Sequence, residues 1–408
     1  MVADDLTGAV DLAAGLAAEG LRTEIRTALG QTSTADVDAV VVALKSRSIG
    51  PQDAVAMSLQ AAQGLLQGGV STLYFKYCST FDSTPEGNIG PVSDALMDLT
   101  AAPIVVVAPG YPAQRRTVYR GHLFVGSRLL SDSAMRHHPL NPMTESNLVT
   151  LMSDQSQHEV GRVGLVQVRN GELGDQLERL SRERVRYAVV DTITDGDLDE
   201  IADACSEHLV VTGGAALAQA MARRSGVAHR AGSWTPPHGR RGVVSGSCSV
   251  ATGRQVRAFA SVGAVLEVDP LSEDHEGAVD AASAWALARP EDEPFLVTTA
   301  TDPGRVAAAQ AAYGGAAGAS HVVEEILGRI ATRLVEGGVR RLVVAGGETS
   351  GAVVAALGVT QLRVVLPIAP GLAWCETADG LALALKSGNF GADSFFSDAL
   401  RMLDEVAS

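Results

Sequence analysis

The segment RRLVVAGGETSGAVVAALG (340–358) shows the pattern that decides the fold. It begins with an apolar run rich in β-branched residues, which is typical of a strand. Gly346 and Gly347 follow, and the residues after them resume an apolar helix-like pattern, so the two glycines mark a turn from strand to helix. Because the apolar run does not alternate with polar residues, we expect a strand that helices cover on both faces.

The same kind of run recurs along the chain between alanine- and leucine-rich stretches. Helices are expected at 53–66, 213–224 and 320–337. Strands are expected in these further segments: 37–44, 103–109, 185–191, 208–214, 240–247, 262–269, 294–300 and 362–371. Alternation of strand and helix predicts the α/β class, with mainly parallel sheets flanked by helices. In such sheets ligands bind beyond the carboxyl ends of the strands.

The chain of 408 residues is long enough for two domains. Residues 225–242 are rich in Gly, Pro and Arg and lack apolar periodicity, which is typical of an interdomain linker. We therefore expect one domain at 1–224 and a second at 243–408. Each should be a mainly parallel sheet flanked by helices, with the active site in the cleft between them.

Composition narrows the classes of function. The net charge of -15 disfavours a partner such as nucleic acid or an anionic membrane surface, although a site for a small anion can still be locally basic. No apolar run is long enough to span a membrane, so we expect a cytoplasmic protein. The four cysteines form no CxxC pair, and the adjacent His137 and His138 do not fit a metal-binding motif, so no metal ligands are predicted.

Two adjacent acids lie almost at the start of the chain. Met1 to Ala3 resemble the end of a strand, and Thr7 and Gly8 precede an alanine-rich helix. Asp4 and Asp5 would then lie at the carboxyl edge of the sheet, where a carboxylate can accept a proton from a substrate hydroxyl or bind a sugar. The alternative is that Asp5 or Thr7 only caps the helix, which would explain one acid but not two.

A second polar segment follows the strand expected near residue 75. It contains Lys76, Ser79, Thr80 and Asp82 and ends in a glycine-containing turn. This density of polar side chains suits a polyhydroxylated anion, with an ordinary surface loop as the alternative. Aromatic residues interleave with the polar ones, which a purely solvated loop would not need.

Three glycine-containing turns follow the linker. They lie in VVSGSCSVATGRQ (243–255), in VVAGGETSGAVVAALG (343–358) and in LALKSGNFG (383–391). Small residues let a backbone approach a ligand closely, and helix N-termini present free amide hydrogens, so the turns predict a phosphate-binding site. The alternative is close packing of strand against helix. Neither GxxxxGK[ST] nor GxGxxG is present, which disfavours a P-loop or dinucleotide-binding site.

Taken together, ADDLTGAVDLA (3–13), KYCSTFDSTPEGNIGPV (76–92) and the three turns resemble the four-carbon acid-sugar kinase family. The segment containing residues 76–92 is most similar to the 3-oxo-tetronate kinase branch. The resemblance extends from Ala3 to about Phe396. It differs at the start, where relatives have several more apolar residues before the two acids.

The resemblance implies an N-terminal domain that binds a small-molecule acid sugar and a C-terminal domain that binds ATP. The implied reaction moves the γ-phosphoryl group of ATP to the C4 hydroxyl of a 3-oxo-tetronate, in catabolism of four-carbon acid sugars. By motif, the substrate positions are Asp4, Asp5, Arg47, Lys76, Ser79, Thr80 and Asp82. The nucleotide positions are Ser247, Ser249, Gly347, Glu348, Thr349, Ser350, Gly351, Gly388, Asn389 and Gly391.

For such a phosphotransferase we expect Asp5 or Asp82 to orient or deprotonate the attacking hydroxyl. Arg47 and Lys76 would bind the substrate carboxylate, and Mg²⁺ would bridge phosphate oxygens with few protein ligands. A homo-oligomer is compatible with the sequence. The alternatives are a threonate or erythronate kinase of the same family, a nucleotide-binding ligase or aldolase-like enzyme, and a non-catalytic sugar-acid-binding protein.

Overall fold

The computed structural model describes residues 1–28, 37–138, 141–227, 234–299 and 302–407. The chain divides into two compact units, Met1–Arg230 and Ala231–Ser408. The segment expected as a linker, 225–242, spans this division, and its residues 228–233 lie outside the described residues. The domain limits and the position of the active site between the domains stay predictions.

The first unit contains a twisted sheet in which every neighbouring pair of strands is parallel. Its strands are, in spatial order, β2 (Thr23–Arg26), β3 (Ala39–Ala43), β1 (Val2–Ala3), β4 (Leu73–Lys76), β11 (Val210–Gly213), β5 (Val105–Ala108), β10 (Tyr187–Val190) and β9 (Val160–Val163). Most are runs of Val, Ile and Ala buried along their length, because helices cover both faces. β1 has only two residues, yet it pairs with β3 on one side and with β4 on the other.

Helices of the first unit form two layers on this sheet. One layer consists of α2 (Pro51–Gln67), α3 (Ile89–Thr100) and α4 (Leu148–Gln155). The other contains α1 (Leu6–Ala18), α8 (Ala215–Arg224) and α7 (Asp195–Ala204), with α5 (Leu165–Arg169) and α6 (Leu173–Arg182) packed next to α7. A small antiparallel sheet of β6 (Arg116–Tyr119), β7 (His122–Val125) and β8 (Arg128–Leu129) follows β5, with short 3-10 helices at Pro112–Gln114, Leu130–Asp132 and Ala134–His137.

The second unit has its own sheet, parallel in its first part and antiparallel in its last. Its strands, again in spatial order, are β13 (Ala264–Val268), β14 (Phe295–Thr299), β12 (Arg240–Ser245), β15 (Val339–Ala345), β18 (Ala382–Lys386), β17 (Leu372–Thr377) and β16 (Gln361–Ala369). β17 is antiparallel to both β18 and β16. The prediction that 362–371 is a strand covered on both faces was wrong: much of β16 is exposed or half-buried. β16 is last in the order within this unit, and it contains Pro367, which lacks a donor for a central strand.

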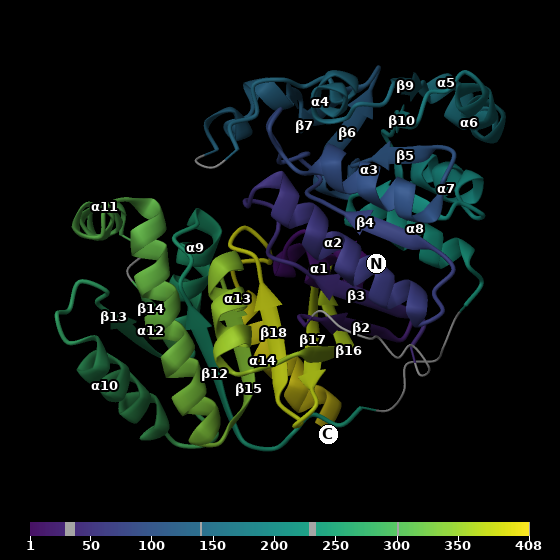
Figure 1. The fold of residues 1–408 in the computed structure, drawn as a ribbon. Coiled ribbons are helices and arrows are strands. Elements are labelled where there is room, and N and C mark those ends of the chain that lie inside the picture. The colour runs from purple at the N-terminus through teal and green to yellow at the C-terminus, as the bar shows by residue number, and fades with distance from the viewer. Residues whose placement is uncertain (29–36, 139–140, 228–233, 300–301, 408) are drawn as a thin grey trace. The chain divides into compact units, whose positions relative to one another are not determined.

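Helices cover both faces of this sheet as well (Figure 1). On one face lie α10 (His275–Leu287), α12 (Ala316–Glu336) and α13 (Gly347–Ala356), with α11 (Pro303–Ala312) packed on α12. On the other lie α9 (Val250–Phe259) and α14 (Phe395–Ala407), which meet through Phe259 and Phe396, whose ring centroids are 6.4 Å apart. The predicted class, α/β with helices flanking mainly parallel sheets in two parts, is confirmed.

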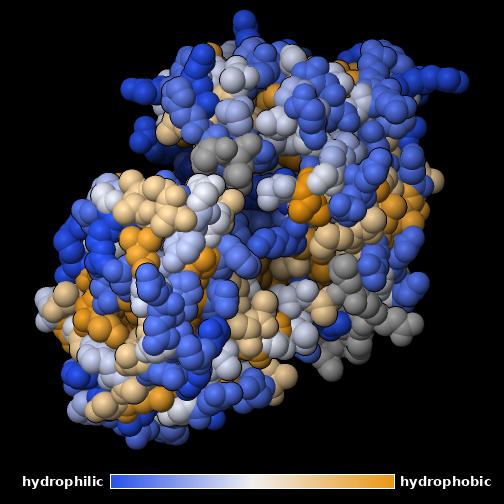
Figure 2. Space-filling view, turned by 60° about the vertical axis from the view of Figure 1, so that its left-hand side comes forward, coloured by the Kyte–Doolittle hydropathy of each residue, from blue (hydrophilic) through white to orange (hydrophobic). Residues whose placement is uncertain are grey.

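On the face drawn in Figure 2, hydrophobic side chains lie in small groups among hydrophilic ones. Within the described ranges, no helix combines the length and the hydropathy needed to cross a membrane.

Candidate functional site

In the first unit, polar residues follow a row of aligned strand ends. Ala3 of β1 is in register with Ala43 of β3 and with Lys76 of β4, which is in turn in register with Gly213 of β11. All these strands are parallel, so the segments that leave them emerge at one edge of the sheet. Asp4 and Asp5 lie at this edge, as the sequence predicted.

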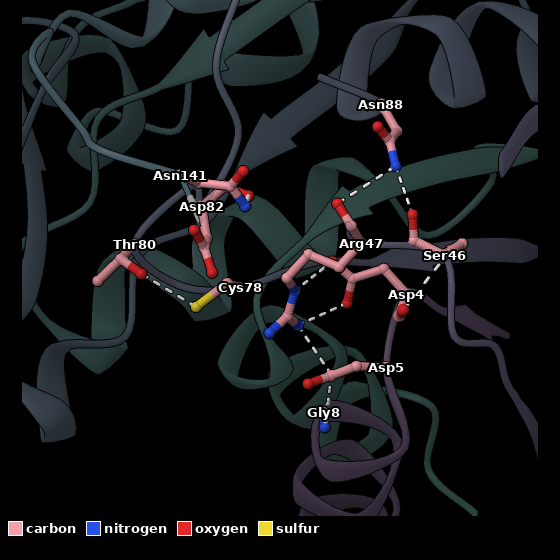
Figure 3. Close-up of polar contacts among 10 residues, drawn as sticks. All are labelled: Asp4, Asp5, Gly8, Ser46, Arg47, Cys78, Thr80, Asp82, Asn88 and Asn141. Atoms are coloured by element: carbon pink, nitrogen blue, oxygen red, sulfur yellow. Dashed lines mark hydrogen bonds and ion pairs between the residues drawn. The ribbon is translucent and has the colours of Figure 1, made fainter. Parts of the chain in front are cut away.

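Asp4, Asp5 and Arg47 form an ion-paired group that we call the acid cluster (Figure 3). The Arg47 guanidinium donates to both oxygens of Asp4, from Nε at 2.8 Å and from Nη2 at 2.7 Å, and Nη2 lies 2.8 Å from Asp5 Oδ1. Burial raises the pKa of Asp4, and the Arg47 charge opposes that rise. Asp5 also caps α1 by accepting from the Gly8 amide at 2.8 Å. Arg47 is thus occupied by carboxylates of its own chain.

The loop that carries Arg47 is held over Asp4 by backbone contacts. The amides of Ser46 and Arg47 both donate to the Asp4 carbonyl, at 3.0 and 3.2 Å. Asn88, at the start of α3, donates its side-chain amide to the Ser46 carbonyl and to the Arg47 carbonyl. Asn88 is therefore a supporting residue that the sequence analysis missed.

Lys76 lies next to the acid cluster. Its side chain is 4% exposed, and a Cβ atom on Gly8 would sit 2.5 Å from Lys76 Nζ and 2.4 Å from Asp5 Oδ1. The two side chains therefore share the space left by the absent side chain of Gly8. Only glycine fits there without displacing one of them.

The loop after Lys76 is fixed by an aromatic stack. Phe75 and Tyr77 have ring centroids 5.5 Å apart, and Tyr77 and Phe81 have theirs 5.4 Å apart, both pairs edge to face. Phe81 is fully buried and adopts a φ of 48°, a left-handed conformation that is rare for a bulky residue. The interleaved aromatic residues thus anchor the polar loop in the core.

Asp82 is the residue of this loop with unused hydrogen-bonding capacity. Its side chain is 8% exposed, and its Oδ1 has no hydrogen-bond partner among the described residues. His138 Nδ1 lies 3.8 Å from that oxygen, while Asn141 donates to the Asp82 carbonyl at 3.3 Å. Such a buried carboxylate oxygen is available to accept a hydrogen bond from a ligand hydroxyl.

The other two predicted loop residues lie on either side of this position. Thr80 is buried, with its hydroxyl 3.0 Å from Cys78 Sγ. Ser79 packs against Gly214 at the start of α8. Both therefore belong to the same edge of the sheet as the acid cluster.

Asp11, on the second turn of α1, is a further carboxylate that the sequence analysis missed. Its Oδ1 is shielded from solvent and has no hydrogen-bond partner among the described residues. Burial raises its pKa to about 6, and the charges of Lys76 and Arg116 oppose the rise. A single acid on an alanine-rich helix was the signal in the sequence. Buried groups with perturbed pKa values concentrate at functional sites.

In the second unit, the three glycine-containing turns also leave one sheet edge. Ser245 is in register with Thr298 on one side and with Ala345 on the other, and Ala345 is in register with Lys386. The turns after β12, β15 and β18 consequently lie next to one another. The N-termini of α9 and α13 follow two of them directly.

Ser247, Ser249, Thr252 and Lys386 form what we call the hydroxyl cluster. The Ser249 side chain caps α9, accepts from the Thr252 amide at 3.1 Å, and donates to the Gly388 carbonyl at 2.5 Å. Thr252 Oγ1 lies 3.1 Å from Ser247 Oγ and 3.0 Å from Ser249 Oγ. A Cβ atom on Gly388 would sit 2.7 Å from Ser247 Oγ, so the cluster requires glycine there. The structure thus brings Ser247, Ser249 and Gly388 together.

The remaining predicted nucleotide residues occupy more varied positions. Gly347 and Glu348 begin α13, and the Thr349 hydroxyl fills the space beside Gly246 and Gly346. Ser350 Oγ is buried without a hydrogen-bond partner in the described part of the chain. A Cβ on Gly351 would meet open space, so nothing in its surroundings requires glycine. Asn389 is exposed, and Gly391 has a φ of 83° and packs against Phe395.

Gln255 on α9 holds the last of these turns. Its side-chain amide donates to the carbonyls of Phe390, Gly391 and Ala392, at 3.0, 3.1 and 2.9 Å. The Gly391 carbonyl is therefore used within the protein.

A groove opens beside the turns of the second unit, between α11, α12 and the start of α13. It encloses about 620 Å³, including space open to solvent. Apolar residues such as Val306, Ala309 and Val323 line it together with Glu348 and Thr349. Its mixed apolar and polar lining is typical of a small-molecule site.

Comparison with known proteins gives a separate family model for each of the two parts of the chain. Residues 1–221 match the family model of a sugar-binding N-terminal domain, and residues 243–396 match that of a nucleotide-binding C-terminal domain. A 3-oxo-tetronate kinase from Cupriavidus necator is 43% identical, over 98% of this chain and 96% of its own. One from Brucella melitensis is 40% identical, over 99% of this chain and 95% of its own. The chain belongs to the 3-oxo-tetronate kinase family.

Solved structures agree with membership of the 3-oxo-tetronate kinase family. A Salmonella typhimurium protein, described as a tRNA synthase, is 42% identical, and the two chains overlap over 98% of each with a TM-score of 0.91. A Haemophilus influenzae protein is 38% identical over 98% of this chain and 99% of its own, with a TM-score of 0.84.

Proposed function

We propose that this protein is an ATP-dependent 3-oxo-tetronate kinase that phosphorylates the C4 hydroxyl of its substrate. The observation that carries the proposal is the 40–43% identity to 3-oxo-tetronate kinases over 98% or more of the chain. As a member of this kinase family, the chain is a phosphotransferase with an alcohol group as acceptor. ATP as donor, C4 as the position and a role in four-carbon acid-sugar catabolism are parts of the proposal.

We assign the substrate to the strand-end edge of the first unit. The anionic acid sugar would meet Lys76 as a nearby cation, while Ser79 and Thr80 offer hydroxyls. Arg47 would bind the substrate carboxylate only by exchanging part of its contact with Asp4 or Asp5. We therefore give Lys76 the larger share of that role.

Asp82 is the preferred candidate to orient or deprotonate the attacking hydroxyl. Its Oδ1 is buried and lacks a hydrogen-bond partner within the described residues, whereas Asp5 already accepts from Gly8 and pairs with Arg47. Phosphoryl transfer needs chiefly alignment and charge neutralisation, with a carboxylate near the hydroxyl. Phe81, whose ring packs against Tyr77, holds the backbone of this loop and would keep Asp82 aligned with the attacking hydroxyl.

We assign the nucleotide phosphates to the turns of the second unit and the adenosine to the groove beside them. Ser247, Ser249 and the amides at the start of α13 would contact phosphate oxygens. Mg²⁺ requires only one or two carboxylates besides phosphate oxygens and water, and Glu348, which lines the groove, fits that requirement. When bound, the ion would neutralise charge on the phosphates.

The decisive experiment is an assay of ADP release with Mg·ATP across four-carbon acids. We expect turnover with one or both enantiomers of a 3-oxo-tetronate, and a 4-phosphate product identified by ³¹P NMR. Faster turnover of threonate or erythronate would move the chain to that branch of the family. Absence of both turnover and ATP binding, the latter measured by thermal shift, would leave a sugar-acid-binding protein and refute the proposal.

A further inference from the structure

Lys386 occupies an unusual position for a lysine. It is the last residue of β18, a strand with neighbours on both sides, and its side chain is 0% exposed. Burying an ammonium group is unfavourable unless a partner compensates it, so most buried lysines pair with a carboxylate.

The partners of Lys386 are all neutral. Its Nζ donates to Thr252 Oγ1 at 3.1 Å, to the Ser387 carbonyl at 2.8 Å and to the Gly388 carbonyl at 2.9 Å. These bonds use all three of its donors. Within the described residues, no carboxylate forms an ion pair with it, and burial lowers its pKa to about 8.

Charged residues on the elements around Lys386 are engaged elsewhere or face solvent. Arg254 of α9 pairs with Asp393 at 2.8 Å, and Arg257 of the same helix is exposed. Arg341 of β15 pairs with Asp404 of α14, and Glu376 of β17 pairs with Arg363. On α13, Glu348 lines the groove. In the part of the chain that the structure describes, the positive charge of Lys386 is therefore balanced by dipoles alone.

The hydrogen-bond partners of Lys386 connect it to Ser247 and Ser249, which are the predicted phosphate contacts. Gly388 O accepts from Lys386 and Ser249. Thr252 accepts from Lys386, and its one O–H lies within donating distance of the Gly388 carbonyl, at 2.9 Å, and of Ser247 Oγ, at 3.1 Å. Ser247 also accepts from the Ser249 amide. When Thr252 donates to Ser247, Ser247 keeps its own O–H for an acceptor outside the cluster.

The geometry points to Lys386 as a positioning cation for the nucleotide phosphates, acting through Thr252 and Ser247 rather than by direct contact. This inference rests on the proposed kinase function and assigns a residue to its nucleotide half. A polyanion bound at Ser247 would stabilise the charged form of Lys386 across this short relay. Affinity should then grow with the negative charge of the phosphate tail.

The inference predicts how proton uptake and nucleotide affinity depend on pH. Because bound phosphate favours the ammonium form, the protein should take up part of a proton on binding nucleotide near pH 8. Nucleotide affinity should be highest at pH values below the pKa that Lys386 has in the free protein. The affinity should fall as pH rises through about 8.

Calorimetry of ATP, ADP and AMP binding at pH 8, in two buffers of different ionisation enthalpy, tests this. For the wild type we expect more proton uptake with ATP than with AMP. In Lys386→Met the uptake should vanish and ATP affinity should fall about tenfold or more, with AMP affected much less. Arg257→Met removes an exposed cation from α9 and should leave proton uptake unchanged.

The outcomes separate this inference from the kinase proposal. ATP binding and turnover without proton uptake by the wild type would overturn the role of Lys386 and leave the kinase intact, whether or not Lys386→Met folds. Proton uptake that persists in a folded Lys386→Met would also overturn it. Absence of ATP binding altogether would refute both.

Discussion

Each unit carries its proposed anion site at the carboxyl edge of a parallel sheet, and the two sites have opposite electrostatic arrangements. In the first unit the cation Arg47 is already paired with Asp4 and Asp5. In the second, the partners of the buried cation Lys386 among the described residues are a hydroxyl and two carbonyls. The difference indicates which part of each site is preformed: the first holds a closed ion-pair network, whereas the second holds a charge that a ligand can still neutralise.

The largest expected effect comes from removing Arg47 from its ion pairs with Asp4 and Asp5. Arg47→Met should destabilise the protein by about 3–5 kcal/mol, because it leaves Asp4 buried without its counter-charge. Urea denaturation measures the loss. The double variant Asp4→Asn with Arg47→Met should recover part of it, and equal stability of wild type and single variant would show that the network contributes nothing.

Replacing Asp82 tests whether its carboxylate is the group that acts on the attacking hydroxyl. Asp82→Asn should lower kcat by about a hundredfold, since it removes the proton acceptor but keeps the shape. The dissociation constant for ATP should stay unchanged. Asp132→Asn alters an exposed acid of the same unit and serves as the control. Near-normal turnover of Asp82→Asn would exclude this role.

Replacing Asp11 tests the cost of the half-buried acid in α1. Burial raises its pKa to about 6, above the ordinary value of an aspartate, so ionised Asp11 destabilises the folded state at neutral pH. Asp11→Asn should therefore raise stability at pH 7 by about 1–3 kcal/mol. The gain should shrink as pH falls from 6 towards 4 and vanish below. A gain that is the same at pH 3 and pH 7 would contradict the pKa shift as its cause.

The smallest effect is expected from Ser249, one of the neutral side chains of the hydroxyl cluster. Ser249→Ala removes the cap of α9 and should cost about 1 kcal/mol of stability. It should also raise the KM for ATP several-fold. Asp274→Ala removes the cap of α10, a helix away from the groove, and should cost similar stability, with KM unchanged. If both variants behave alike towards ATP, Ser249 is only a cap.

The strands and turns were predictable because their signals are local. Runs of Val, Ile and Ala become buried parallel strands, and the glycines after β12, β15 and β18 mark the turns. Asp4 and Asp5 could be placed at a strand end for the same reason. The reading of 362–371 failed because an apolar run does not reveal its place in the sheet order, although Pro367 argued against a central position.

Lys386 and Thr252 could not be found from local signals. In sequence, Lys386 resembles any lysine that ends a strand, and only the order of strands places it between β15 and β17 with no access to solvent. Thr252 becomes its partner across 134 residues of chain. Asp11 did leave a local signal, because it is a lone acid in the alanine-rich segment that forms α1.

The left-handed backbone of Phe81 has a consequence for how this site can diversify. Glycine at that position would relieve the conformational strain but remove the ring that stacks on Tyr77. Loss of a buried phenylalanine ring costs about 3–5 kcal/mol, more than the roughly 1–3 kcal/mol of such backbone strain, so phenylalanine is favoured here despite its conformation. With Ser79 and Thr80 as the proposed substrate contacts, a new substrate preference would disturb the fold less through those two side chains than through the main chain that presents them.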